Sequence, residues 1–357
     1  MKKKSLFHIP ILGSITAVCM TVIAMLILEI NTAFAHVHGH DDHSTIQTTF
    51  SPRQIERLLA NSTRPDFDAR WLTPVLNYFE HTAMETDLTS RQRMFYARLL
   101  QHEHRFDEAQ LQLEMLLEMN PLNTQARLLL ANVALNQGQA DEAILLCERL
   151  IGQTDLLVAT TCLMEARMQQ KPSEIHYTQL QKVTRFSERA PVQVQTWINE
   201  VLADMALYTD NPEEAIAYCE RTERSDWPVS TWVAWSKAKL QMNQGREILT
   251  HLAPLIDKTA VPNDSMLLYL ALAEQQVGGE HKWIKQMAQR VQLREVNQDT
   301  SHAAEVALYY LHLADEPAQA LTWATINWDN AKSLNDQLLL DQAKAANQVA
   351  RQSEHAD

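Results

Sequence analysis

The fold of this 357-residue chain is decided by one stretch, Ala97–Pro121, which reads ARLLQHEHRFDEAQLQLEMLLEMNP. An altered copy begins 34 residues later, at Ala131, and reads ANVALNQGQADEAILLCERLIGQTD. Each copy contains a DEA triplet that ends in an alanine, Ala109 or Ala143, and this alanine lies 12 residues after the first residue of the copy. Small residues at two fixed positions of a 34-residue period are typical of a helical hairpin that is stacked on copies of itself.

The same period extends over most of the chain. The segment ANVALNQG, which ends at Gly138, reappears about three units downstream as AKLQMNQG, which ends at Gly245. The 12-residue offset recurs at two further pairs, the second with a larger first residue: Ala203 with Ala215, and Leu308 with Ala320. The pattern fades between residues 158 and 190, where Ala166 fits the phase but no second alanine follows. We therefore count seven units over residues 90–334, five clear and two degenerate.

The residues between the alanines explain how each unit folds. Two helices of ~12–14 residues and two short turns fill ~34 residues, and the small side chains let paired helices approach closely. The elements NQG, DNP and DEP end one helix and begin the next, while Pro121 and Pro262 mark exits from a unit. The chain has only seven Gly and lacks the Gly-rich loop that cradles a phosphate. We therefore expect an all-α protein and exclude dinucleotide-binding and P-loop folds.

Over residues 90–334, the pattern resembles the tetratricopeptide repeat. Its spacing of small residues and its closing prolines match that family, whereas the aromatic residue usual on the first helix is mostly replaced by Leu or Ala. The resemblance implies a right-handed α-solenoid of about seven helical hairpins, preceded by a flexible N-terminal tail. It also implies that the first helices line a concave groove, which in this family usually holds an extended peptide or a partner helix.

Carried over by phase, the resemblance implies a partner-binding groove with ten side chains. They are Arg91, Met94, Arg98, Asn132, Asn136, Trp197, Trp232, Trp235, Lys239 and Tyr309. Trp and Arg are favoured at binding hot spots, and Arg91, Arg98 and Asn132 can hold a carboxylate such as a chain terminus. As an alternative, Trp232 and Trp235 lie three residues apart on one helix and pack in the core.

Residues 1–35 have the pattern of a segment that directs export. Lys2 to Lys4 precede an uncharged, mostly apolar run at Ile9–Leu28, and Ala33 to Ala35 form the small-x-small pattern of a cleavage site. We expect a signal peptide and a periplasmic protein. The alternative is an uncleaved anchor, which leaves the protein in the inner membrane, facing the periplasm. Removing these residues changes the net charge from −13 to −15, which disfavours nucleic acid and anionic membranes as partners.

Residues 36–50 are rich in His and Asp, and we expect a disordered tail there. Cleavage after Ala35 gives His36 a free amine, which can join the His38 imidazole and the intervening backbone nitrogens around Cu(II) or Ni(II). Zinc is a further option for this segment. The candidate ligands are His36, His38, His40, Asp41 and His43. The alternative is a solvated tail without a cognate ion, and the rest of the chain requires no cofactor.

Residues 51–89 and 335–357 are predicted to flank the array. Before it, we expect one helix at Pro52–Ala60, capped by Ser51, and a second at Asp66–Phe79, where Pro74 either kinks the helix or marks its true start. These helices cover the open end of the array, since terminal units need a different outer face. After it, we expect a solvating C-terminal helix whose apolar side carries Leu338, Leu339 and Ala343.

Three cysteines follow the leader, and an odd count leaves at least one unpaired. Cys147 and Cys219 each lie four residues after the small residue of a second helix, on a face expected to be buried. We expect three buried thiols that behave as small apolar side chains; the alternative is a disulfide between Cys147 and Cys162. A small polar cluster, His102 and His104, is expected to be a solvated turn, because residues i and i+2 of a helix point apart.

No pattern supports catalysis, since the sequence has neither a G-x-S-x-G elbow nor an HExxH zinc helix. The sequence favours an exported scaffold, not an enzyme, which binds a partner protein or peptide in its concave groove and serves metal handling or metalloprotein assembly if the tail binds a metal. The alternative is a Cu, Ni or Zn protein that acts through residues 36–43, with the solenoid docking it to a transporter or metalloenzyme. We expect no nucleic-acid partner, and membrane contact only through an uncleaved leader.

Overall fold

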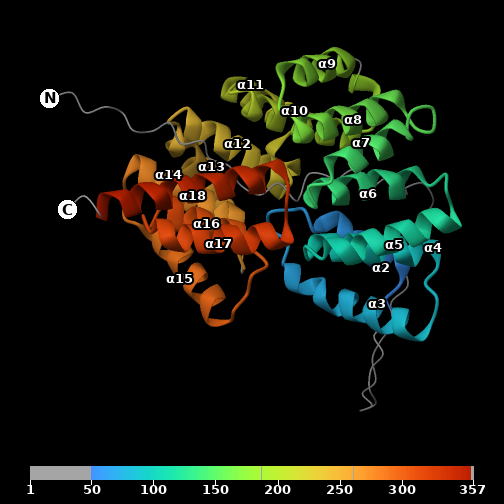
Figure 1. Cartoon of the computed structure of the whole chain (residues 1–357), viewed down its shortest axis with the longest axis horizontal. Helices are drawn as coiled ribbons and strands as arrows, with labels where there is room; N and C mark the ends of the chain where they lie inside the picture. The colour runs from blue at the N-terminus through green and yellow to red at the C-terminus, as the bar shows by residue number, and fades with distance from the viewer. Residues whose placement is uncertain (1–49, 186, 260, 355–357) are drawn as a thin grey trace.

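The computed structural model describes residues 50–354, apart from residues 186 and 260, and every regular element in that part of the chain is a helix (Figure 1). Seven helix pairs follow one another along the chain. They are α4 (Ser90–His102) with α5 (Phe106–Met119), α6 (Thr124–Asn136) with α7 (Ala140–Glu148), α8 (Leu156–Gln170) with α9 (Glu174–Thr184), α10 (Val192–Tyr208) with α11 (Pro212–Cys219), α12 (Val229–Gln241) with α13 (Gly245–Ile256), α14 (Asp264–Val277) with α15 (Lys282–Val296), and α16 (Ala303–His312) with α17 (Pro317–Asn330). The prediction of an all-α solenoid of about seven hairpins is confirmed.

Further helices flank or link these pairs. Before the array lie α2 (Pro52–Asn61), the short 3₁₀ helix η1 (Ala69–Trp71) and α3 (Thr73–Glu85); after it lies α18 (Leu334–Glu354); and the links contain the 3₁₀ helices η2 (Ser187–Arg189) and η3 (Arg224–Asp226). Within the described residues, no helix is both long and apolar enough to cross a membrane. The predicted leader and the predicted flexible tail lie outside the described residues.

The small residues that defined the period lie where paired helices touch. Ala97, Ala109, Ala131 and Ala143 are each exposed by 2% or less. The larger residue at the same position of the last pair, Leu308, is also buried, at 1%. Each hairpin therefore buries its small residues between its own helices and presents its remaining apolar side to the next pair.

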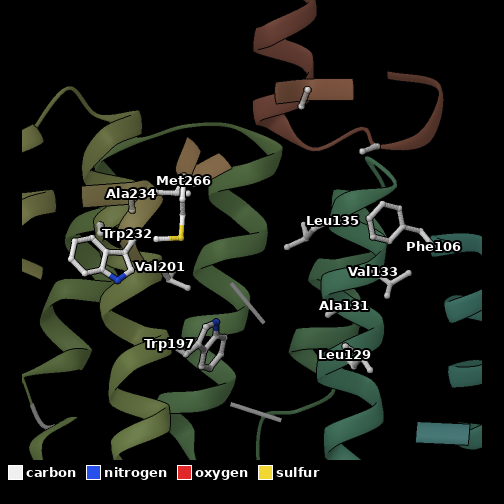
Figure 2. Packing of buried hydrophobic residues seen from close by; sticks show 14 of the residues in the cluster. Phe106, Leu129, Ala131, Val133, Leu135, Trp197, Val201, Trp232, Ala234 and Met266 are labelled. Atoms are coloured by element: carbon white, nitrogen blue, oxygen red, sulfur yellow. The ribbon is translucent and has the colours of Figure 1, made fainter. Parts of the chain in front are cut away.

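The apolar core runs from pair to pair without a break. Figure 2 shows Leu129, Ala131 and Val133 of α6 on one side and Trp197 of α10 and Trp232 of α12 on the other. All five side chains are exposed by 3% or less. Because each pair shields the apolar side of its neighbour, the array has one continuous core.

The turn between the two helices of a pair has a recurrent backbone conformation. Six of the seven turns contain a residue with positive φ: His104, Gly138, Asp210, Asn243, Gly278 with His281, and Asp315. Gly adopts this region at no steric cost, and Asn, Asp and His adopt it more readily than other residues. The NQG and DNP elements therefore reverse the chain through a single left-handed residue.

The helices that precede the array differ from the prediction in one boundary. α2 starts at Pro52 and is capped by Ser51, as predicted. The second helix begins at Thr73 rather than at Asp66, and it continues to Glu85. Pro74 lies in its first turn, where a missing N–H costs nothing, so Pro74 marks the start of the helix and does not kink it.

The weak unit between residues 158 and 190 is a regular helix pair, α8 with α9. Ala166 is fully buried, as its phase predicts. No small residue faces it from α9, whose buried side chains are Tyr177, Leu180 and Thr184. Larger side chains therefore fill this helix interface, which explains why the repeat signal fades in the sequence.

The structure differs from the first expectation for the three cysteines. Cys147 of α7 and Cys162 of α8 form a disulfide whose Cα atoms are 5.6 Å apart. Cys219 is buried and free. The expectation of three free thiols is therefore wrong, and the alternative pairing of Cys147 with Cys162 is the one present. The position of the cysteines within the repeat could not predict the disulfide, because burial of both side chains is equally compatible with two thiols and with a disulfide.

The array curves until its ends meet its middle and each other. The backbone N–H of Val229, at the start of α12, donates to the carbonyl of Thr63 in the α2–α3 loop at 2.8 Å. Near the other end, the N–H of Lys332 donates to the carbonyl of Asn136 in α6 at 2.6 Å. The rings of His104, in the first pair, and His302, just before the last pair, have centroids 6.1 Å apart. The concave side is thus largely enclosed by the chain itself.

Candidate binding site

A cavity of about 260 Å³ lies between the two ends of the array, and we call it the inner cavity. Its walls are residues 62–64 and 67–70 of the α2–α3 loop, residues 101–104 at the end of α4, and the starts of α12, α14 and α16, together with Arg290 and Arg294 of α15. Residues from the first pair and the last three pairs therefore meet around one space, which exists because the array closes on itself.

The inner cavity has apolar walls as well as polar ones. Phe67 of the α2–α3 loop, Val233 of α12 and Val261 before α14 contribute apolar side chains. The charged residues of its wall balance one another: four arginines, Arg64, Arg70, Arg290 and Arg294, and four carboxylates, Asp68, Glu103, Asp264 and Glu305. A ligand that fits this space must combine apolar with polar groups.

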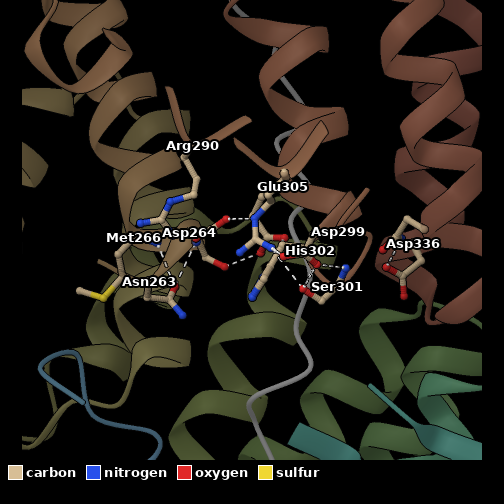
Figure 3. A network of polar contacts seen from close by, with 12 residues as sticks. Asn263, Asp264, Met266, Arg290, Asp299, Ser301, His302, Glu305 and Asp336 are labelled. Carbon is tan, nitrogen blue, oxygen red and sulfur yellow. Dashed lines mark hydrogen bonds and ion pairs between the residues drawn. The ribbon is translucent and has the colours of Figure 1, made fainter. Parts of the chain in front are cut away.

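One side of the cavity is held by a network of ion pairs (Figure 3). Asp264, at the start of α14, accepts from Arg294 Nε at 2.5 Å and also pairs with Arg290. Arg294 Nη1 reaches Asp299 at 2.5 Å. Asp264 is 2% exposed, and a carboxylate that deeply buried is stable when two guanidinium groups compensate its charge. The network fixes the position of α14 relative to α15.

A histidine pair lies beside this network, since Asp264 and Arg294 both act on the charge of His302. His104 has a left-handed backbone, with φ of 58°, so its ring leaves the helix and lies between the rings of Phe106 and His302. Burial and the nearby His302 lower the pKa of His104 to about 4. Burial lowers the pKa of His302 as well, but the hydrogen bond and charge of Glu305 outweigh it and raise that pKa. The expectation of a solvated turn at residues 102–104 is therefore wrong for His104.

The ten residues predicted to line the groove lie mostly inside the molecule. Seven are exposed by 7% or less: Met94, Arg98, Asn132, Asn136, Trp197, Trp232 and Trp235. Lys239 and Tyr309 are partly buried, and Arg91 is exposed. They lie on the first helices, as the resemblance implied, but most of them are buried. Their contact with a partner stays a prediction.

Particular contacts explain these positions. Trp232 and Trp235 pack against Trp227, with ring centroids 4.7 Å and 5.9 Å from its ring. The alternative prediction, that both side chains pack in the core, is therefore confirmed. Arg91 pairs with Glu56 of α2 at 2.5 Å, outside the cavity. Asn132 accepts a hydrogen bond from Gln101, which itself lines the inner cavity.

The predicted metal ligands His36, His38, His40, Asp41 and His43 lie outside the described residues. Within residues 50–354, apart from 186 and 260, no group of three or more His, Cys, Asp or Glu side chains has the geometry to hold a metal ion. The inner cavity shows instead what sequence reasoning missed. Asp264 is the first residue of α14, Arg290 and Arg294 belong to α15, and no repeat position marks them.

Comparison with known proteins places these repeats in a family. The model of the tetratricopeptide repeat matches residues 97–155, from within α4 to the residue before α8. No curated protein sequence matches the chain. A solved structure, the crystal structure of the P58(IPK) TPR domain, is similar at 14% identity over 84% of this chain and 97% of that one, with a TM-score of 0.28. The family model therefore covers most of the first two helix pairs, and the later pairs repeat the same hairpin arrangement along the chain.

Proposed function

We propose that the chain is an exported, periplasmic scaffold that holds a segment of a partner protein in the inner cavity. The observation that carries this proposal is the cavity itself, about 260 Å³ of space bounded by both ends of a tetratricopeptide array. Proteins of this family typically bind protein partners. The walls supply apolar side chains for anchoring and charged groups for orientation, the combination found in binding sites of high specificity.

Two features support export. Residues 1–35 have the composition of a signal peptide. The disulfide between Cys147 and Cys162 suits an oxidising compartment, since cytosolic reductants keep most thiols reduced. Mass spectrometry of the protein from a periplasmic fraction tests this directly: we expect a first residue of His36 and a disulfide between Cys147 and Cys162. A chain that begins at Met1, or reduced cysteines, would contradict export with cleavage.

A second candidate function rests on the sequence of residues 36–43, where four His and two Asp can bind Cu, Ni or Zn. Under this proposal the array docks a metal-carrying tail to a transporter or metalloenzyme. The same mass spectrometry, under native conditions, reports a bound metal ion. Loss of the ion after deletion of residues 36–43, with partner capture unchanged, assigns metal binding to the tail and capture to the cavity.

Filling the inner cavity tests the scaffold function. Ala69 lines the cavity and is exposed, so Ala69→Trp fills the space without disturbing the core. Ala83→Trp is the matched control, because Ala83 is exposed on α3 and lies outside the cavity wall. With residues 36–357 as bait in a periplasmic extract, we expect Ala69→Trp to reduce capture of the partner at least tenfold. Equal capture by the two variants would contradict the proposal.

A further inference from the structure

A second, smaller cavity of about 20 Å³ lies next to the inner cavity, and we call it the acidic pocket. It is walled by α6, α8 and α10 and by Ser333, and its acidic side chains are Glu165 of α8 and Asp204 of α10. The hydrogen bond from Gln101, in the wall of the inner cavity, to Asn132, in the wall of the acidic pocket, separates the two spaces. A volume of this size holds one water molecule or one group of similar size, such as an ammonium group.

Two carboxylates in or near the wall of the acidic pocket, Glu200 and Asp204, each have one buried oxygen that accepts no hydrogen bond from the described part of the chain. Glu200 of α10 is 3% exposed, and its Oε1 accepts from Ser230 Oγ at 2.7 Å and from Thr231 Oγ1 at 2.6 Å. Its other oxygen, Oε2, is buried and has no hydrogen-bond partner among the described residues. The same is true of Asp204 Oδ1. A buried acceptor without a donor is unfavourable, so these oxygens favour the entry of a donor.

The pocket is also short of positive charge. Burial and the carboxylates of Asp204 and Glu200 raise the pKa of Glu165 to about 8. Burial likewise raises the pKa of Glu200 to about 8 and of Asp204 to about 7. The nearby cation, Lys237 of α12, has its own pKa lowered by burial to about 8, and it interacts also with Asp336 and Glu305. Near neutral pH, the carboxyl groups of Glu165 and Glu200 are therefore mostly protonated.

The loop between α17 and α18 covers the acidic pocket, and we call residues 331–335 the C-terminal plug. Ser333 lies in the pocket wall. The plug is joined to the concave side by the N–H of Lys332, which donates to Asn136 at 2.6 Å, and by the N–H of Leu334, which donates to Gln169 Oε1 at 3.0 Å. Displacement of the plug breaks these two hydrogen bonds and opens the first turn of α18, whereas Leu339, Leu340 and Ala343, further along that helix, are buried and can stay in place.

We propose that the acidic pocket is a binding site for one lysine side chain of the partner segment, and that the C-terminal plug occupies its entrance until the partner displaces it. This inference rests on the proposed function, since it names a feature of the segment that the cavity holds. The ammonium group carries three N–H donors, which can reach the oxygens of Glu165 and Asp204 in the pocket wall. Binding ionises these carboxyl groups, so protons leave as the lysine enters.

Isothermal titration calorimetry of residues 36–357 tests the site with two probes, the acetylated and amidated tetrapeptides Ala-Lys-Ala-Ala and Ala-norleucine-Ala-Ala. We expect the lysine peptide to bind at least tenfold more tightly at pH 7. We also expect proton release, seen as a dependence of the apparent enthalpy on the buffer. The double variant Glu165→Gln, Asp204→Asn should lose both effects. The control Glu118→Gln, Glu142→Gln also replaces two carboxyl groups by amides, but at exposed positions, and should keep both effects.

A cross-link tests the plug. The plug lies directly against Gly138, where an added Cβ would stand 3.0 Å from the Cβ of Lys332 and 2.9 Å from its carbonyl oxygen. The backbone of the plug must therefore move outward before two cysteines reach the usual Cβ separation of about 3.5–4.5 Å in a disulfide. The variant Gly138→Cys, Lys332→Cys should lose binding of the lysine peptide when oxidised and regain it after mild reduction, whereas the wild type should not respond. Unchanged binding of the lysine peptide by the oxidised variant would contradict the proposal that the C-terminal plug blocks the entrance of the pocket.

The outcomes separate this inference from the proposed function. Equal affinity for the two peptides, or full affinity in Glu165→Gln, Asp204→Asn with an unchanged melting curve, would overturn the lysine site. Partner capture that depends on Ala69 would still support the scaffold. Binding of Mg²⁺ or Ca²⁺ alone, lost in the double variant, would also overturn the inference, because it would identify the pocket as an ion site.

Discussion

At the scale of single residues, the array depends on positions where two helices approach too closely for a side chain. Gly245 is such a position at the start of α13. Its N–H donates to Gln276 Oε1 at 2.8 Å, and an added Cβ would lie 3.0 Å from the carbonyl oxygen of Ala273 in α14. Because that neighbour is backbone, it cannot rotate away. The NQG that ends at Gly245 therefore serves packing, while the left-handed turn residue is Asn243.

Gly245→Ala should destabilise the fold by ~1–3 kcal/mol, the usual cost of overpacking. Gly279→Ala is the matched control, because its Cβ would meet Glu274 at 3.6 Å, an ordinary van der Waals distance. We expect that control to be neutral or to stabilise the fold by up to ~1 kcal/mol, since Ala lowers the entropy of the unfolded chain. Urea unfolding measures both free energies. A Gly245→Ala variant as stable as Gly279→Ala would show that the two helices separate freely.

At the scale of elements, the sequence predicted the regular helix pairs, but it did not predict the larger side chains between α8 and α9 or the start of α3. Repeated small residues mark five pairs clearly, because close helix packing leaves a trace at fixed positions in the sequence. The α8–α9 pair leaves a weaker trace, since Tyr177 and Leu180 fill its interface instead. The sequence did not determine where α3 begins, because Pro74 is compatible both with a kink inside a helix and with the first turn of a helix. Which of the two occurs depends on the packing of Val75, Leu76 and Phe79.

The disulfide is a further feature at this scale. Cys147 and Cys162 belong to successive helix pairs, so their bridge ties α7 to α8 across a link in which Gly152 has a φ of 79°. The sequence indicated burial of Cys147 but not its partner, because pairing requires two Cβ atoms within reach and with suitable directions. Cys219 has no such neighbour among the described residues and remains a buried thiol.

At the scale of the whole molecule, the closed curve brings together groups that no local pattern connects. His104 faces His302, and around them lie Glu103, Glu305 and Arg294. The pKa of His104 is lowered to about 4, mainly by burial, from an ordinary value near 6.5. His104 is therefore neutral in the closed form. Its contribution to stability is present above pH 6.5 and is lost as the pH falls from there towards 4.

Acidification should accordingly weaken the contact between the two ends of the array. A charged His104 repels His302, whose charge Glu305 maintains. We expect the radius of gyration from small-angle X-ray scattering to increase between pH 6 and pH 4. His104→Asn keeps a residue that tolerates positive φ but cannot take up the proton, so this variant should stay closed to lower pH. The same expansion in the variant and the wild type would assign the opening to other groups.

The sequence by itself determined the class of fold, the number of helix pairs and the residues buried between paired helices. These properties are local and periodic, so Ala97, Ala131 and their counterparts record them directly. The tertiary structure alone decided that the concave side is closed, that most predicted groove residues are covered, and that a cavity and an acidic pocket lie between distant segments. The physical reason is that curvature is the sum of small rotations from pair to pair, and no single residue encodes that sum.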